Sequence, residues 1–286
     1  MSTWPFTVTA AALATILLAR KLRDPIAAVV LPLSVAVIFI CAWQYSCDAM
    51  SYELQQSDGT VRRIELFPTP WQTLVDNVQP IRDGTLLSFS IMSVYRVAVG
   101  FGIAAIIGIP LGLWAGWYMR SFQALNPLFQ FLRPISPIAW IPFAVLWFGI
   151  KDSAAIFLIG LSSFFPIVTG TLTAVRAIPG VYVRTANNYG IEGFELFRRV
   201  VFPACLPQIV TSLRMALGIA WMVIVAAEMI AVDSGLGYQI MDSRNANNYA
   251  RVAGAMVTIG LIGVALDFAM RRLEHLDQVR WGFSRL

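Results

Sequence analysis

The segment RTANNYGIEGFELFRRVVFPACLP, residues 184–207, is polar, charged and interrupted by glycine, and it lies between two long apolar runs. A polar insert of about twenty residues is longer than the few residues that usually join two helices. The sequence on either side is apolar enough to lie in lipid, whereas this segment is not. The insert therefore predicts a substantial structure on one side of a membrane.

Local signals predict a short helix inside this insert. Gly190 interrupts the chain, and Glu192 and Glu195 then suit the first turn of a helix, where negative charge complements the helix dipole. That helix is predicted to end at residues 198–199, which are arginines, and Pro203 marks the return to the membrane. Aromatic residues beside these charges indicate either a surface that docks another protein or a helix that lies on the bilayer.

The composition also indicates a membrane protein. The chain of 286 residues is 58% hydrophobic and 13% charged, with a mean hydropathy of +0.69, whereas soluble domains average about 25% charged residues. Because a membrane helix needs about 20 mostly apolar residues, we predict an all-α membrane protein with about seven transmembrane helices. The predicted spans are residues 4–19, 25–46, 86–116, 123–149, 153–175, 205–231 and 252–270.

Basic residues predict the orientation of these spans. They gather after the first, third and fifth spans and in the C-terminal tail, and all four places fall on one side if seven spans are counted. We assign that side to the cytoplasm, because cytoplasmic loops carry excess Lys and Arg, so the N-terminus lies outside and the C-terminus inside. The first span could instead be a secretory signal, but its basic residues follow the apolar stretch, which fits an N-out anchor better.

The third span carries small residues at every fourth position, which places them on one helix face: Gly100, Ala104, Gly108, Gly112 and Gly116. Small residues let another backbone approach closely. Membrane helices associate through such close packing, because lipid provides no hydrophobic driving force between them. Glycine is also common in membrane helices generally. Five small residues in register nevertheless favour tight packing against a neighbouring helix.

Ionisable residues inside spans are expensive in lipid and therefore informative. Arg96 lies in the third span and Glu228 in the sixth. One interpretation is that they line a polar pathway. The other, which we favour, is that they pair with each other or with backbone carbonyls and hold helices together.

The segment RPISPIAWIPFAVLWFG, residues 133–149, contains three prolines that break regular helical hydrogen bonding. Such breaks are tolerated at membrane depth only where protein or a water-filled cavity covers them. The segment is therefore either pathway lining or a kinked packing helix. The pathway candidates in the whole chain are Arg96, Arg133, Ser136, Trp140, Trp221 and Glu228.

Motifs for catalysis are absent from the sequence. It contains no G-x-x-x-x-G-K-[ST] phosphate loop, no G-x-S-x-G elbow and no H-E-x-x-H zinc motif. The three cysteines are scattered and the single histidine lies near the C-terminus. We therefore expect no catalytic residue, metal or cofactor in this chain, and no role in nucleic-acid binding.

The polar insert resembles the "EAA" loop of ABC-importer permeases, in which a glycine is followed after nine residues by I-x-L-P. Here Gly190 is followed after nine residues by Val200-Val201-Phe202-Pro203. Four further blocks agree in order: FPTPWQ (67–72), SVYRVAVGF (93–101), LRPISPIAWIPFAVLWFG (132–149) and VAAEMIAVDSGLGY (225–238). Together with the basic tail, they resemble the nitrate/sulfonate/taurine/bicarbonate branch of that family over residues 66–275.

The resemblance implies a type I ABC-importer permease core with a cytoplasmic coupling helix. It implies N-terminal extra helices at 1–46, a periplasmic segment at 47–85, a core at 86–271 with a coupling loop at 177–203, and a cytoplasmic tail at 272–286. The coupling residues that it implies are Arg184, Thr185, Ala186, Gly190, Glu192, Glu195, Phe197 and Pro203. Arg184 departs from the family pattern, which has an acidic residue there.

The resemblance also implies partners and a location. They are a second permease copy in a homodimer, two ATPase subunits that bind ATP and magnesium, a periplasmic or lipid-anchored solute-binding protein, and the lipid of a bacterial inner membrane. The substrate would be a small anion: nitrate, bicarbonate, taurine or another sulfonate. The alternatives are a stand-alone secondary transporter or channel, which should show inverted repeats and acidic relay residues, and a membrane scaffold, which would not need the prolines and the insert together.

Overall fold

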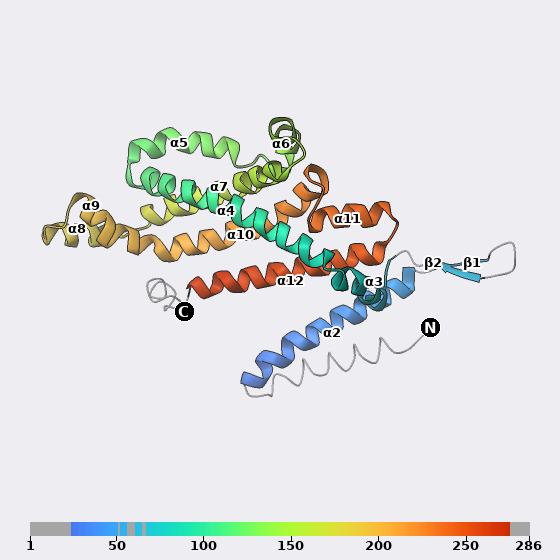
Figure 1. Ribbon diagram of the computed structural model, residues 1–286. Helices are drawn as coiled ribbons and strands as arrows, with labels where there is room; N and C mark the ends of the chain where they lie inside the picture. The colour runs from blue at the N-terminus through green and yellow to red at the C-terminus, as the bar shows by residue number, and fades with distance from the viewer. Residues whose placement is uncertain (1–23, 51, 56–60, 65–66, 275–286) are drawn as a thin grey trace. The chain divides into compact units, whose positions relative to one another are not determined.

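The computed structural model describes residues 24–50, 52–55, 61–64 and 67–274 of the chain (Figure 1). Almost all of them are helical, as predicted. The elements are α2 (Asp24–Met50), strands β1 (Tyr52–Gln55) and β2 (Val61–Ile64), α3 (Pro70–Arg82), α4 (Thr85–Trp117), α5 (Met119–Leu132), the 3-10 helix η1 (Pro137–Trp140), α6 (Ile141–Phe148), α7 (Asp152–Arg176), α8 (Gly180–Asn188), α9 (Gly193–Leu196), the π-helical turn η2 (Phe197–Val201), α10 (Phe202–Ala231), α11 (Leu236–Asn245) and α12 (Tyr249–Glu274).

The described residues form two compact units: those up to 83 together with 243–254, and 84–242 together with those from 255 onward. In the first unit, α2 meets the start of α3, where the Trp43 indole N–H donates to the Pro68 carbonyl at 3.0 Å. Thr69 caps α3 through a reciprocal pair of hydrogen bonds with Gln72. Between α2 and α3, β1 and β2 pair as an antiparallel hairpin that the sequence analysis did not predict.

Five described helices are long and apolar enough to cross a membrane: Leu31–Ala49, Thr85–Trp117, Asp152–Arg176, Gly193–Ala231 and Tyr249–Glu274. They correspond to the predicted spans 25–46, 86–116, 153–175, 205–231 and 252–270. A sixth crossing is available to the bent pair formed by α5 with η1 and α6. The predicted span 4–19 lies outside the described residues.

The predicted span 123–149 is wrong as a single continuous helix. Met119–Leu132 and Pro137–Phe148 are bent by 84° relative to one another. Ser136, which precedes Pro137, has φ −58° and ψ 131°, an extended conformation that a following proline favours. The prolines noted in the sequence therefore separate two helices instead of kinking one.

The predicted separation between a short helix in the polar insert and the span that begins at 205 is also wrong. Helical structure runs without a break from Gly193 to Ala231, through α9, η2 and α10. Pro203 is the second residue of α10, which begins where η2 ends. Within a regular α-helix, the proline ring clashes with the carbonyl four residues earlier. The wider π turn before Pro203 relieves this clash, so the helix continues without ending.

The core of the second unit is the packing of α7 against both α4 and α10, and α4 and α10 also touch one another. A Cβ added at Gly100 would lie 2.7 Å from the Ile156 carbonyl oxygen, and one at Gly112 would lie 2.7 Å from the Thr171 Cβ. Both distances are too short for a real side chain, so only glycine permits this backbone approach. The predicted close packing of the small-residue stripe is confirmed, and its partner is α7.

Candidate functional site

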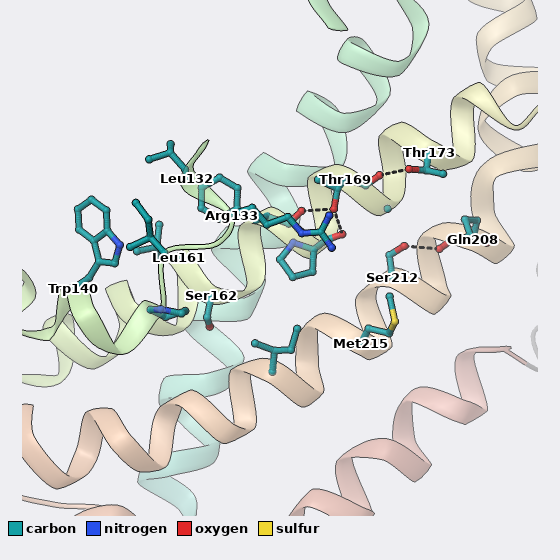
Figure 2. A pocket seen from close by; sticks show the side chains of 16 residues that line it. Leu132, Arg133, Trp140, Leu161, Ser162, Thr169, Thr173, Gln208, Ser212 and Met215 are labelled. Atoms are coloured by element: carbon teal, nitrogen blue, oxygen red, sulfur yellow. Dashed lines mark hydrogen bonds between the residues drawn. The ribbon is translucent and has the colours of Figure 1, made fainter. Parts of the chain in front are cut away.

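A cavity of about 610 Å³ opens between three parts of the second unit, and Figure 2 shows the side chains around it. The bend between α5 and α6 contributes one side, the middle of α7 another and the first half of α10 the third. The lining residues are Leu132, Arg133, Ile135, Pro137, Trp140, Leu161, Ser162, Phe165, Pro166, Thr169, Gly170, Thr173, Gln208, Ser212, Met215 and Ile219. The proline bend therefore borders a cavity, which is the setting that makes broken helices tolerable at membrane depth.

Arg133 supplies the charge of this cavity. It is the C-cap of α5, and its side chain is exposed. The 16 lining residues, all in the described part of the chain, include this one arginine and no acidic side chain. The cavity consequently presents a net positive charge in a largely apolar wall.

The hydroxyl groups around the cavity donate to their own helix backbones. Thr169 Oγ1 donates to the Phe165 carbonyl at 2.7 Å, and Ser212 Oγ donates to the Gln208 carbonyl at 2.8 Å. Ser162 and Thr173 make bonds of the same kind, at 2.8 and 2.7 Å. Figure 2 shows the bonds of Thr169, Thr173 and Ser212 as dashed lines.

Two of the other predicted pathway residues do not line this cavity. Ser136 is exposed at the bend and precedes η1. Trp221 is 7% exposed, and its indole N–H donates to the Ile259 carbonyl on α12 at 3.0 Å, so it joins two helices. Gln208 lines the cavity but was not predicted from the sequence, where its only signal is an amide one turn before Ser212 within an apolar span.

Arg96 and Glu228 also lie away from the cavity, in a buried ion-pair network. Both residues are 0% exposed, and Arg96 Nη1 lies 2.6 Å from Glu228 Oε1. Arg96 Nη2 lies 2.6 Å from Asp152 Oδ1 at the start of α7, and Nη1 also donates to the Ser234 carbonyl at 2.8 Å. The pairing between Arg96 and Glu228 that we favoured is therefore present, and the arginine's charge is compensated by two carboxylates.

The same network caps α11. The Gly237 N–H donates to Glu228 Oε2 at 3.0 Å, and the Leu236 N–H donates to Ser93 Oγ at 3.0 Å. These N–H groups have no partner within their own helix, so a buried carboxylate and a hydroxyl satisfy them. A Cβ at Gly237 would collide with the Val225 carbonyl and the Glu228 side chain, and Gly235 has φ +102°.

A second ion-pair cluster joins α10 to α12. Arg214 Nε lies 2.7 Å from Asp267 Oδ1, and Nη2 donates to Oδ2 at 3.1 Å, which makes the pair bidentate. Arg214 Nη1 lies 3.2 Å from Glu274, and Arg271 also bonds Asp267 at 2.9 Å. These side chains are partly exposed, unlike Arg96 and Glu228.

The polar insert, residues 184–207, comprises the second half of α8, then α9, η2 and the first residues of α10, and it presents aromatic side chains. Tyr189 is 81% exposed and Phe194 is 78% exposed, and the Phe194 ring stacks on Phe197 with centroids 6.5 Å apart. Ala186 and Leu196 face inward and join a buried cluster with the start of α10. Of the other implied coupling residues, Arg184, Thr185, Gly190, Glu192 and Glu195 are exposed, and Phe197 and Pro203 are half-buried.

The sequence comparison identifies a family, and the structure comparison finds a shared fold. Residues 108–276 match the model of the family described as "Binding-protein-dependent transport system inner membrane component". A chain of the MetNI methionine ABC transporter, solved in an inward-facing conformation, shares the fold with a TM-score of 0.59 and 18% identity over 66% of this chain and 94% of that one.

Three relatives have names that state a substrate. The nitrate import permease protein NrtB of Leptolyngbya laminosa is 33% identical over 80% of this chain and 81% of its own length. The bicarbonate transport system permease protein CmpB of Synechococcus elongatus is 34% identical over 87% and 89%. The putative aliphatic sulfonates transport permease protein SsuC of Bacillus subtilis is 32% identical over 73% and 76%. The chain therefore belongs to the binding-protein-dependent transport system inner membrane components, as an ABC importer permease related to those for nitrate, bicarbonate and sulfonates.

Proposed function

We propose that this chain is the membrane subunit of an ATP-driven importer for a small anion, with nitrate, bicarbonate, taurine and other sulfonates as the candidates. The observation that carries the proposal is the cavity between the α5–α6 bend, α7 and α10, whose lining holds a single positive charge and no carboxylate. Alternating exposure of this cavity to the two sides of the membrane would move the anion. The relatives' names support the same substrate class.

The polar insert is proposed as the element that couples this cavity to a separate ATPase. Its exposed aromatic residues offer a docking surface, with Tyr189 and Phe194 most prominent. Helical structure continues from Gly193 into α10, so Phe194 and Ser212 lie on one continuous helix. Along the helix axis these two residues are about 27 Å apart. A displacement at the insert would therefore reach the cavity wall directly.

The charge on this docking surface differs from the family pattern. Arg184 stands where an acidic residue is expected, and it is exposed. Glu192 and Glu195 are proposed to supply the negative charge instead; Glu195 already pairs with Arg199 at 2.8 Å, with both side chains more than half exposed. Replacing both glutamates with alanine should weaken the association with the ATPase, measured by co-purification. Unchanged association and transport would remove the two glutamates from the proposal.

The proposed assembly contains two copies of this chain, two ATPase subunits that bind ATP and magnesium, and a solute-binding protein on the outer face. The N-terminus is placed outside and the C-terminus in the cytoplasm of a bacterial inner membrane, on the distribution of basic residues. This chain itself is proposed to be non-catalytic.

Reconstitution tests the proposal. The chain is purified with its ATPase subunit, inserted into proteoliposomes and supplied with its solute-binding protein and a labelled anion. We expect uptake that requires ATP, and ATP hydrolysis that the loaded binding protein stimulates. Uptake of the anion by this chain alone without ATP would instead establish a stand-alone transporter or channel.

A further inference from the structure

We infer that a second cavity, between the end of α4 and the α9–η2 segment, holds one anionic phospholipid of the inner leaflet. Its acyl chain lies against aromatic side chains, and its headgroup lies among arginines. The inference goes beyond the proposed function, from which it takes only the assignment of this end of α4 to the cytoplasmic side.

The walls of this cavity suit hydrocarbon. Its volume is about 520 Å³, and it lies between the last two turns of α4 and the helical turns that begin at Gly193. Trp114 is 50% exposed and Phe194 is 78% exposed, so the rest of the described chain leaves these large rings uncovered. None of the lining residues is charged; they are Pro110, Leu113, Trp114, Trp117, Tyr118, Gly193, Phe194 and Phe197.

The depth of the cavity favours a lipid over a side chain from a soluble partner. The apolar span of α4 ends at Trp117, and tryptophan and tyrosine rings gather at the headgroup level of a membrane. Pro110 lies seven residues earlier, so the cavity extends about 10 Å along the span from its end. Acyl chains occupy this depth, whereas a cytoplasmic protein would have to leave water to reach it.

Two exposed arginines flank the lining residues in the sequence: Arg120 at the start of α5 and Arg198 in η2. Neither side chain makes a hydrogen bond or ion pair with another residue of the described chain, whereas the neighbouring Arg199 pairs with Glu195 at 2.8 Å. A guanidinium can donate two parallel bonds to a phosphate, and such charge-assisted bonds are among the stronger ones. Both arginines are therefore available to a phosphodiester headgroup.

The surrounding charges also favour an anion. Arg176 packs on the start of α5, with its guanidinium carbon 3.8 Å from the Phe122 ring centroid and its Nη2 3.2 Å from Met119 Sδ. These contacts do not neutralise its charge. Even with Glu192 at the N-cap of α9 included, the arginines here outnumber the glutamates. Basic pockets at the cytoplasmic ends of membrane helices attract anionic headgroups, whereas a zwitterionic lipid has no net charge to match.

The cavity also adjoins the surface that is proposed to meet the ATPase. The Phe194 ring lines the cavity and stacks on Phe197 with centroids 6.5 Å apart. A lipid tail in the cavity consequently packs against the same ring that belongs to the docking surface. Lipid composition would then affect how firmly this ring is held.

Native mass spectrometry of the full-length chain, purified in complex with its ATPase subunit, tests the inference. The probes are dioleoyl phosphatidylglycerol and dioleoyl phosphatidylcholine, which share acyl chains and differ in headgroup charge. We expect the first phosphatidylglycerol to bind at least several-fold more tightly than phosphatidylcholine. Arg120→Gln and Arg198→Gln should each weaken phosphatidylglycerol binding about fivefold and leave phosphatidylcholine unchanged.

Matched variants separate the site from its surroundings. Arg272→Gln removes an arginine that lies over Phe268 on α12, and it should leave phosphatidylglycerol binding unchanged. Trp114→Ala removes part of the apolar wall and should weaken both lipids. Trp147→Ala, which replaces a similarly exposed tryptophan on α6 outside the cavity, should weaken neither. Assembly with the ATPase subunit confirms that each variant is folded.

Equal affinity for the two lipids would overturn the anionic headgroup, and equal losses in Arg198→Gln and Arg272→Gln would overturn the location. A phosphatidylglycerol with a diazirine on its acyl chain should crosslink to residues 110–118 or 193–197 in the assembled complex. Crosslinking there only when the ATPase subunit is absent would mean that the ATPase fills the cavity, and would also overturn the inference. These results leave the proposed function standing if ATP-driven anion uptake persists, whereas uptake without ATP removes that function and leaves the lipid affinities as measured.

Discussion

Replacing Arg96 with methionine should be among the most destabilising single substitutions in the second unit. Arg96 is fully buried and is bonded to Glu228, Asp152 and Ser234, so its removal leaves a buried carboxylate without a counter-charge. Breaking a buried ion pair by deleting one partner typically costs about 3–5 kcal/mol. The Asp152 side chain is 45% exposed, so Asp152→Asn should cost only about 1 kcal/mol or less.

The assay is equilibrium unfolding of the purified chain in mixed dodecylmaltoside–SDS micelles, followed by circular dichroism. Arg96→Met and Glu228→Met are measured singly and together, with Asp152→Asn as the control for an exposed partner. Because the double variant removes both buried charges, its loss of unfolding free energy should be smaller than the sum of the single losses by about 2 kcal/mol or more. Additive losses, or an Arg96→Met loss no larger than that of Asp152→Asn, would refute the view that this pair is a buried structural network.

Three other substitutions test separate contacts. Gly112→Ala should lower the unfolding free energy by about 1–3 kcal/mol, because the added methyl group overpacks against α7. Gly102→Ala on the same helix, where an added Cβ meets nothing within 4 Å, should be neutral. Equal effects of the two variants would contradict the α4–α7 packing. Gly237→Ala should disturb the cap of α11 and increase amide hydrogen exchange there, while Gly218→Ala, which also meets open space, should not. Arg214→Ala should lower the midpoint of thermal unfolding slightly. High salt should remove the difference between this variant and the native chain, because the Arg214 side chain is 29% exposed and its ion pair is screened. A loss that does not depend on salt would argue against a screened ion pair.

Periodicity in the sequence predicted the helices and the face on which they pack. A spacing of four placed Gly100 and Gly112 on one face, and the structure confirms that both approach another helix too closely for a side chain. The sequence did not indicate that the partner is α7, because small residues show that a backbone comes near without showing which one. The breaks between helices were partly predicted, because prolines marked the bend between α5 and α6. The direction of the chain after Ser136 was not predicted, because it depends on the surroundings of the bend.

The candidate site was less predictable than the fold. Arg96 and Glu228 were conspicuous because charges inside spans are rare, yet their partner Asp152 lies at a helix start where a carboxylate is ordinary. Gln208 was missed for a related reason, since one amide near the end of a span usually reaches the membrane surface. Its position beside Ser212 becomes informative only when α7 and the α5–α6 bend are placed around it.

We propose that the cavity lined by Arg133, Thr169 and Ser212 lies on an alternating-access pathway. The most direct test labels Thr169→Cys with a membrane-impermeant methanethiosulfonate in the reconstituted complex, in a background where Cys41, Cys47 and Cys205 are replaced. We predict that the side of the membrane from which labelling is fast reverses when ATP and vanadate trap the ATPase. Labelling from one side only, at a rate that nucleotide does not change, would contradict alternating access at this cavity.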